Sequence, residues 1–540
     1  MADYATLLRD HVSLEVRCVD RFFLQGYIPQ LQSVGMVCKF LRWQRHIPIP
    51  SSAAFGKIGD AYVKDIQAYA KANGLEVVHF KKGENKEQMV RPLIDAAAVA
   101  GSDGKVVLIG VAQEKTPVWR SWPAKGQENK AHPHMEWGRQ SGFVNHCYFY
   151  LFDPDWGPAF IKTNAYAPWP IWIYLNGHEW AKRQLEIAGI GYQALDNGFR
   201  SCDDPVALQR ICDRLGPEPV RNFYWRWFNR LPSPVTTEDV KAGYGYELAF
   251  RQFEVSDTVV FDRPASGRAF FEGVIRDHLD VGRPDQVALV FDRKVNARTP
   301  GTFRTKVITR GVDPQLSIYY KSTRLKQYWK EGRALRTETV ICNTRDFGIG
   351  RRVNAENWHA LVVVGEQANR RLCGAQAKDA VPASDTVTLE QVTCPSETPD
   401  GLHAPGLRFG DRRVMALMAA IVGFTHLIAG FDNPALVERV AGLIDAPYTS
   451  RQATYDLRRL RRKGIIEHAA TSSRRYQLTD HGRRVAVLFT KAHSRVLPPG
   501  LVQLDPNLPA DIANRSPLAQ AWRKLDRTLN DYIKAQIIAA

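Results

Sequence analysis

The sequence lacks the short motifs that identify several large classes of enzyme. It contains no G-x-x-x-x-G-K-[ST] loop, which argues against an ATP-driven motor, and neither H-E-x-x-H nor G-x-S-x-G occurs. The eight cysteines are dispersed and form no C-x-x-C pair. We therefore expect neither a nucleotide cofactor nor a structural zinc ion.

Long hydrophobic runs are also scarce. The segment from Val414 to Phe431 is almost entirely apolar, but it contains Thr425 and His426, and a membrane span needs about 20 apolar residues. We expect it to form a buried helix of a C-terminal domain, where it is also a candidate contact in a homodimer. The first twenty residues carry charges throughout, which argues against a signal peptide. These features predict a cytoplasmic protein.

Positive charge is abundant and unevenly placed. The formal net charge is +17 over 540 residues. Residues 449–500 hold 12 Lys/Arg and 3 Asp/Glu, and residues 293–352 hold 15 Lys/Arg and 4 Asp/Glu. The rest of the chain is close to neutral. Two local basic zones on a near-neutral protein predict contact with a long polyanion, with DNA favoured over RNA.

The first basic zone begins with a helix signal. Thr449 can cap a helix, because its hydroxyl can accept a hydrogen bond from an amide of the first turn. Ala453, Leu457 and Leu460 then recur at helical spacing and predict a buried side. Gly464 predicts the end of the helix. Arginines occupy much of the remaining surface of this helix.

After this helix the sequence predicts a strand, a basic hairpin tip at 471–475, a second strand and a helix capped by Thr479. This order resembles the winged helix of MarR- and ArsR-like bacterial regulators, over about Arg413 to Val496. The matching segments are 455–460 with 464–466, and 476–479 with 482–484. The resemblance implies one helix in the major groove and a wing on phosphates. The predicted nucleic-acid-binding residues are Arg451, Gln452, Thr454, Tyr455, Arg458, Arg459, Arg462, Arg474 and Arg475. Protein contact or dimerisation through the same fold is the alternative.

The second basic zone alternates basic and non-basic residues, which in a strand places the basic ones on one face. Tyr319, Tyr328 and Trp329 interleave with these cations. Aromatic rings beside cations suit single-stranded nucleic acid, because rings stack on unpaired bases. A solvated charged face is the alternative. The predicted contact residues are Arg304, Lys306, Arg310, Lys321, Arg324, Lys326 and Arg336.

Helix and strand patterns alternate in the first 115 residues, which predicts a small, largely parallel sheet. For the whole chain we expect an α/β and α+β multidomain protein. The predicted divisions are an α/β domain at 1–115, a loop at 116–142, an α+β domain at 143–256, a basic β-rich domain at 257–374, a linker at 375–411, the winged helix at 412–500 and a helical tail at 501–540.

Two groups of residues are candidates for catalysis. Glu114 and Lys115 follow an apolar strand and, with Asp103, are similar to the acid and lysine layout of restriction-like nucleases; strand-end capping is the alternative. Asp153 and Asp155 with His178 and Glu179 resemble the start of an RNase H-like nuclease, which implies Mg²⁺ ligands at Asp153 and Asp155. The alternative for this pair is an ordinary turn, because aspartate is common in turns.

Taken together, these patterns predict a nucleic-acid-processing factor of the mobile-element type, a metal-dependent nuclease or strand-transfer protein. The alternative is a non-catalytic DNA- or RNA-binding protein, either a transcriptional regulator or a component of an RNA–protein particle. The chain as a whole also resembles a group of bacterial proteins without an assigned activity, which implies a bacterial source.

Overall fold

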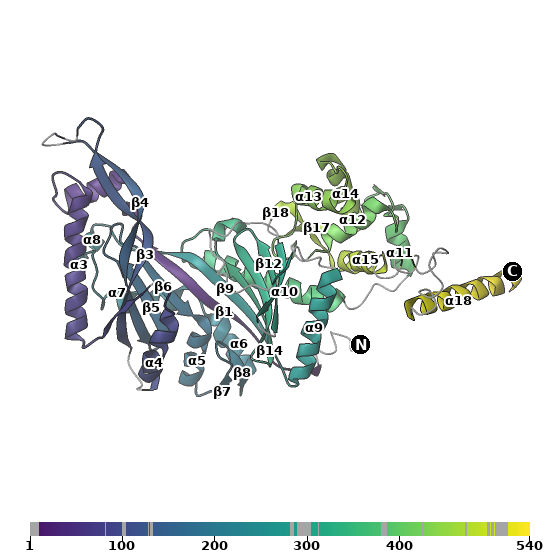
Figure 1. The fold of residues 1–540 in the computed structure, drawn as a ribbon, viewed down its shortest axis with the longest axis horizontal. Coiled ribbons are helices and arrows are strands. Elements are labelled where there is room, and N and C mark those ends of the chain that lie inside the picture. Colours follow the sequence, from purple (N-terminus) through teal and green to yellow (C-terminus); the bar gives the residue numbers. More distant parts are fainter. Residues whose placement is uncertain are drawn as a thin grey trace.

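The computed structural model describes residues 10–539 except 82, 100–103, 128, 130–132, 281–285, 289–303, 311–312, 380–385, 424–425, 470–471, 494–496, 498–501 and 503–516. It is a mixed α/β protein built around a 12-stranded sheet (Figure 1). In sheet order the strands are β10 (Gln286–Ala288), β11 (Arg304–Arg310), β12 (Asp313–Tyr320), β13 (Thr323–Lys330), β14 (Ala334–Ile341), β9 (Glu247–Phe261), β1 (Val12–Tyr27), β6 (Ile171–Asn176), β5 (Gly157–Asn164), β4 (Met135–Asp153), β3 (Lys105–Pro123) and β2 (Val77–Phe80).

This sheet crosses the predicted domain divisions, because it contains strands from 1–115, 143–256 and 257–374. β2 runs parallel to β3 and β10 runs parallel to β11, while the other neighbouring strands in the described chain are antiparallel. The prediction of a small, largely parallel N-terminal sheet is therefore wrong. Helix and strand patterns alternate only up to β3, after which consecutive strands pair as hairpins.

The two halves of the sheet repeat one strand order. Outward from the centre, one half runs β1, β6, β5, β4, β3 and β2, and the other runs β9, β14, β13, β12, β11 and β10. In chain order, each half starts with its central strand and ends with four consecutive antiparallel strands. β1 and β9 are antiparallel over almost their whole length. The centre of the sheet is therefore a junction between two similarly connected halves.

The predicted loop at 116–142 is mostly strand. β3 and β4 have 19 residues each and pair continuously from Lys105 to Pro123. They extend beyond the rest of the sheet as a two-stranded arm, visible at one end of Figure 1. Prolines and tryptophans obscured the alternating pattern in the sequence. Proline has no amide N–H. Pro117 and Pro123 are tolerated in β3 because, in an antiparallel pair, only alternate residues donate a hydrogen bond to the neighbouring strand.

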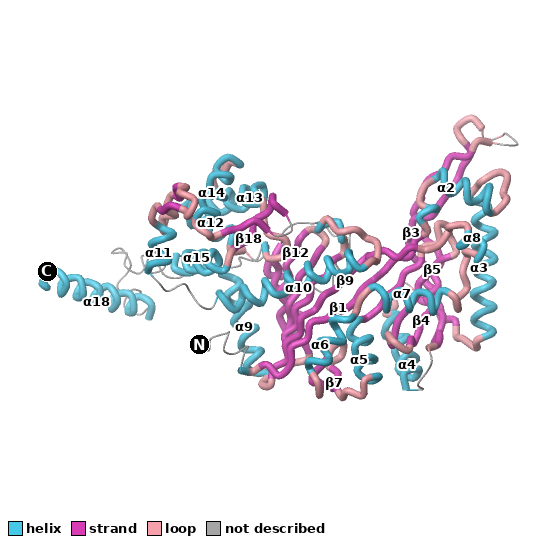
Figure 2. Tube along the Cα trace, turned by 180° about the vertical axis from the view of Figure 1, so that it is seen from behind, coloured by secondary structure: helices cyan, strands magenta, loops and turns pink. Residues whose placement is uncertain are grey.

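Helices cover the two faces of the sheet unequally. One face packs on α3 (Ser52–Ala72), α7 (Pro217–Phe228), α9 (Pro264–Asp280) and α10 (Ala355–Asp379). The opposite face contacts α4 (Lys86–Val99), α6 (Pro205–Arg214) and the first residues of α5 (Gly177–Ile187). Figure 2 shows the same arrangement from behind. This part also contains α8 (Thr237–Lys241), the hairpin of β7 (Tyr192–Ala194) and β8 (Phe199–Cys202), α2 (Val34–Lys39) and the short helices η1 (Pro29–Leu31), η2 (Phe40–Gln44) and η3 (Thr344–Phe347).

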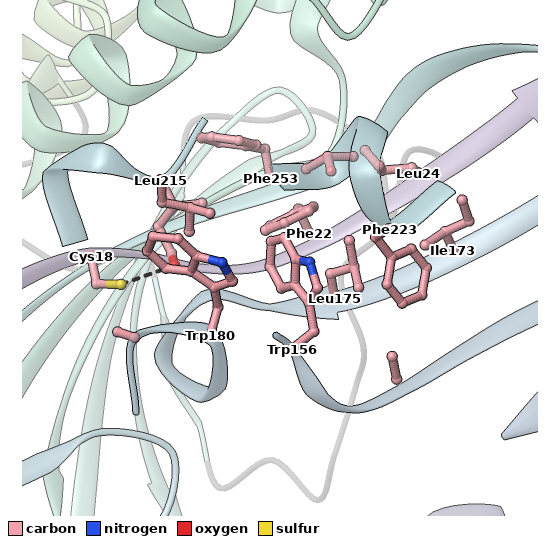
Figure 3. Packing of buried hydrophobic residues seen from close by; sticks show 14 of the residues in the cluster. Cys18, Phe22, Leu24, Trp156, Ile173, Leu175, Trp180, Leu215, Phe223 and Phe253 are labelled. Carbon is pink, nitrogen blue, oxygen red and sulfur yellow. Dashed lines mark hydrogen bonds between the residues drawn. The ribbon is translucent and has the colours of Figure 1, made fainter. Parts of the chain in front are cut away.

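The main hydrophobic core is centred on β1 and is rich in aromatic rings (Figure 3). Phe22 packs edge-on against Trp156 and Trp358, with ring centroids 5.5 and 5.3 Å away. Trp156 in turn contacts Trp180 and Phe223. These rings come from β1, the β4–β5 turn, α5, α7 and α10. The core therefore ties helices from both halves to the central strand.

The C-terminal unit, residues 386–493, has its own hydrophobic core. It contains α11 (Thr386–Thr393), β15 (Ser396–Glu397), β16 (His403–Ala404), α12 (Arg412–Ile421), α13 (Asn433–Ile444), α14 (Ser450–Arg462), β17 (Ile466–Ala469), β18 (Ser472–Leu478) and α15 (Asp480–Lys491). α18 (Pro517–Ala539) follows. The predicted linker is thus partly ordered structure: α10 extends to Asp379, and Val392 and Leu407 belong to this core.

Several local predictions in this unit are confirmed. Thr449 caps α14 in a capping box with Gln452, and Thr479 caps α15. The apolar run at 414–431 is buried as expected, but its helix ends at Ile421. Arg474 and Arg475 lie within β18 and not at a hairpin tip. Within the described ranges, every helix is too short or too polar to span a lipid bilayer.

A glycine at the start of α5 provides a test of this packing. A Cβ atom at Gly177 would lie 1.9 Å from the carbonyl oxygen of Val19, so Gly177→Ala requires the helix and β1 to separate. We expect a loss of about 1–3 kcal/mol in the free energy of unfolding, measured by denaturant titration. Gly374→Ala in α10 is the control, because no atom lies within 4 Å of its Cβ position. Equal stability of the two variants would contradict the packing.

Candidate functional site

The candidate site lies on the sheet face opposite α10, which we call the polar face. Strand pairing defines it: Lys326, Glu338 and Ser256 are direct cross-strand neighbours on β13, β14 and β9. The same face continues through β1, β6 and β5 to Glu114 on β3. Its other members near the centre of the sheet are Asp20, Arg21, Phe23, Phe160, Lys162, Trp172, Tyr174, Gln252, Glu254, Tyr319, Arg324, Tyr328 and Arg336.

A fully buried arginine organises the centre of this face. Arg336 on β14 contacts Asp20 at 2.6 Å and Glu338 at 2.7 Å. It also donates to the backbone carbonyl of Asn197. Burial favours the neutral side chain, but the charge of Arg336 and a hydrogen bond from His178 outweigh this effect and hold the pKa of Asp20 well below its ordinary value. Asp20 and Arg336 therefore form a buried ion pair.

The second carboxylate oxygen of Asp20 is hydrogen-bonded as well. Asn197 donates to Asp20 at 2.7 Å, and the Nδ1 atom of His178 lies 3.2 Å from it. Asn176 donates to Asn197 and, with its own side chain, caps α5. Burial and the neighbouring Arg336 lower the pKa of His178, which favours the neutral imidazole. The start of α5 is thus fixed to β1 by a hydrogen-bonded network.

Three carboxylates meet beside this network. One oxygen from each of Asp20, Glu254 and Glu338 lies within 4.8 Å of the others, and all three residues are buried. Glu338 accepts a hydrogen bond from Tyr328 at 2.7 Å and forms an ion pair with Lys326. Burial raises the pKa of Glu254 to about 7. This group of carboxylates could hold a metal ion.

A second polar cluster surrounds Glu114 toward the other end of the polar face. Its carboxylate accepts from Lys86 at 2.7 Å, from Lys162 at 2.8 Å and from the hydroxyl of Tyr148. Burial opposes ionisation, but the two lysines outweigh it and lower the pKa of Glu114 to about 2. Lys115 is exposed and points to the opposite face, and Asp103 lies outside the described residues. Glu114 is therefore an ion-pair centre and is not joined there by Lys115.

The other predicted catalytic residues are engaged in ion pairs and hydrogen bonds within the protein. Asp153 is fully buried at the end of β4, where it accepts from the turn amides of Asp155 and Trp156 and from Trp227. Arg226 pairs with both Asp153 and Asp155. These contacts match the alternative interpretation as a structural turn. His178 belongs to the Asp20 network instead, and Glu179 pairs with Lys182.

Two of the predicted contact residues on the central sheet are neutralised by acids. Arg336 is buried, and Lys326 is paired with Glu338. Arg324 is half-buried and donates to Ser317, whereas Lys321 is exposed in the turn between β12 and β13. The side chains of three predicted contacts fall outside the described part: Arg304, Lys306 and Arg310.

On α14 the predicted residues separate into two groups. Arg451, Thr454, Tyr455 and Arg458 are exposed on one side of the helix. The side chain of Gln452 belongs to the capping box. Three arginines instead donate to backbone carbonyls within the protein: Arg459 to Pro405, Arg462 to His403 and Arg475 to Ala429. Arg474 is exposed on β18.

Sequence reasoning missed the acids at the centre of the polar face. β1 continues through these positions to Tyr27, with an irregularity between Val19 and Phe22 that accommodates Asp20 and Arg21. A charged pair inside a long alternating strand was the available signal. Glu254 and Glu338 gave no signal, because β9 and β14 meet only in the folded sheet.

Comparison with protein-family models, with curated proteins and with solved structures finds no match for this chain.

The raised pKa of Glu254 predicts a pH-dependent stability. The unfolded carboxyl ionises near pH 4.5 and the folded one only near 7, so stability falls as the pH rises between these values. We expect Glu254→Gln to gain up to about 3 kcal/mol over the natural protein between pH 4.5 and 8, measured by urea unfolding. Glu438→Gln, an exposed position on α13, is the control. A constant difference between Glu254→Gln and the natural protein would contradict the raised pKa.

Proposed function

We propose that the protein binds duplex nucleic acid through the exposed side of α14. The observation that carries this proposal is the separation of the two sides of this helix. Ala453, Leu457 and Leu460 are buried in the C-terminal unit, while Arg451 and Arg458 extend into solvent. The order of α13, α14, β17, β18 and α15 supports a winged helix, in which such a helix enters the major groove.

The attachment of α14 supports this role. Asp456 is buried and accepts from Arg413 at 2.7 Å and from Tyr448 at 2.7 Å. These bonds fix the rotation of the helix about its axis. The exposed residues at 451, 454, 455 and 458 then face one direction, since neighbours three and four apart share one side of a helix. A rigid helix with a basic outer side suits a regular duplex.

Replacing the exposed arginines tests this proposal. We expect Arg451→Ala with Arg458→Ala to weaken duplex DNA binding, because two phosphate contacts are lost. The slope of log affinity against log salt should fall by about 1.8, measured by fluorescence anisotropy from 50 to 300 mM salt. Arg408→Ala, which removes another exposed arginine of the C-terminal unit, should leave the slope unchanged. An unaltered slope in the double variant would refute the α14 interface.

A second candidate function is metal-dependent cleavage of phosphodiester bonds on the polar face. It is favoured by the convergence of Asp20, Glu254 and Glu338, whose oxygens suit Mg²⁺. Arg336 and Lys326 already balance part of their charge, so an ion here would compete with Lys326 for Glu338. Glu254 is the least committed of the three, with one hydrogen bond from Gln252. These residues fit an ion provided that Lys326 moves.

An ion held by Asp20, Glu254 and Glu338 would supply an activated water. Arg336 holds Asp20 and Glu338 in place, and Lys326, once released from Glu338, would be available to a phosphate oxygen. The rival is a nucleic-acid-binding protein without catalysis, in which the same network is structural. Both agree with the α14 interface, so they differ only in the role of the polar face.

Glu254→Gln distinguishes these two roles. If the carboxylates bind metal, the variant should lose Mn²⁺ binding by calorimetry and at least about 100-fold of any Mg²⁺-dependent cleavage of DNA or RNA. Asp155→Asn is the control at the turn that sequence analysis favoured. Loss of cleavage in Asp155→Asn alone would move the site to that turn. Absence of cleavage and of metal binding in the natural protein favours the non-catalytic role.

A further inference from the structure

We propose that the polar face also binds nucleic acid, and that its ligand is a single strand with unpaired bases. This second site is separate from the duplex interface on α14 and extends beyond the function proposed above. It is formed by half-buried aromatic side chains and cations that cross adjacent strands of the sheet. Its β12 and β13 residues belong to the second basic zone of the sequence, whereas its β5, β6 and β1 residues form no continuous sequence motif.

Aromatic rings form one side of this site. Phe23, Tyr174 and Phe160 are cross-strand neighbours on β1, β6 and β5. The rings of Phe160 and Tyr174 are stacked, with centroids 5.3 Å apart and planes 5° from parallel. Trp172 lies two residues from Tyr174 on the same strand and therefore on the same face. The group is half-buried, so its rings are only partly used by the core.

Cations accompany the rings on both sides of the sheet centre. Lys162 lies 4.4 Å from the ring centroid of Trp172. Arg21, whose side chain is 44% exposed, projects from the irregular part of β1. On the other half, Arg324 lies over Tyr319 and Lys326 over Tyr328. A base stacked on these rings would bring its phosphates close to the neighbouring cations.

This surface has a small excess of positive charge. The excess favours an anionic ligand but is smaller than that of a surface that binds duplex nucleic acid. The cations on it are Lys86, Lys162, Arg21, Arg324, Lys326 and Arg336, and the acids are Asp20, Glu114, Glu254 and Glu338. Most of these charges are paired with each other. Two of these cations are only weakly paired. Arg21 lies 3.9 Å from the carboxylate of Asp20, and Arg324 donates a hydrogen bond to the hydroxyl of Ser317. Stacking must therefore supply most of the affinity.

The arrangement selects unpaired bases. In a duplex the faces of the bases are covered by their neighbours, so a row of rings on a sheet has nothing to stack on. Single-stranded ligands expose those faces, and recognition by aromatic rings on a sheet is common for RNA and single-stranded DNA. The row from β12 to β5 crosses seven strands, or about 30 Å at 4.8 Å per strand. This length matches a site of several nucleotides.

α4 borders this row at one end, and the start of α5 with the 195–198 turn lies against its centre, whereas Trp172, Tyr174 and Phe160 stay half-buried. α4 packs on β3 and β4, where Phe80 and Val90 form a small core. At the other border, His178 and Asn197 contact Asp20. The helices α3, α7, α9 and α10 pack on the opposite face. The carboxylates Glu254 and Glu338 lie in this same row, so a bound strand would pass over them.

The decisive experiment compares single-stranded and duplex ligands of the same sequence. Fluorescein-labelled dT15 and rU15 should bind the natural protein, and Trp172→Ala with Tyr174→Ala should weaken both at least 10-fold, because stacking on each ring contributes substantially. Duplex affinity should stay unchanged. Trp225→Ala, which removes an exposed ring on α7, is the control and should bind single strands normally. Either the DNA or the RNA strand satisfies the proposal.

Failure of the single-strand site and failure of the α14 duplex interface give different results. Arg451→Ala with Arg458→Ala should leave dT15 and rU15 binding intact; equal loss of single-strand binding in that variant would overturn the second site. If the aromatic variant fails to fold, as judged by circular dichroism, Arg21→Gln decides. It should lower the salt slope for dT15 by about 0.7. An unchanged slope, or undiminished binding by a folded aromatic variant, refutes the proposal.

Discussion

The buried guanidinium of Arg336 is the contact on which the centre of this protein depends. It joins β14 to β1 through Asp20 and to the 195–198 turn through Asn197. Removing two charges from water is costly, and the pair is tolerated only because its other polar atoms are also bonded. Asn197 and His178 supply those bonds. The network thereby fixes the start of α5 and the junction of the two halves of the sheet.

This junction explains why the two faces of the sheet differ. One face is apolar and covered by α3, α7, α9 and α10, which give the sheet its stability. On the opposite face the same strands carry charged residues at the alternate positions. These charged residues form ion pairs with one another. Burial of ionisable groups at the centre of a sheet is expensive, so such a cluster is more typical of a site than of a scaffold.

The basic charge of the chain has two different uses. On α14 some arginines are exposed, and others donate to backbone carbonyls of the 403–406 segment. Part of the positive charge therefore holds the C-terminal unit together. On the central sheet most cations are balanced by carboxylates. The net charge alone therefore overstated the surface available to a polyanion, and the two nucleic-acid sites that we propose differ in kind: one is basic and rigid, the other aromatic.

The sequence by itself determined the local features. The caps at Thr449 and Thr479 and the buried side of α14 follow from short-range patterns, because a helix signals its period within a few residues. Only the tertiary structure decided which strands are neighbours. The meeting of Asp20, Glu254 and Glu338 requires β1, β9 and β14 to align, and residues hundreds of positions apart leave no joint pattern in one sequence. Whether a cation is free or paired is decided in the same way, by neighbours that folding brings close.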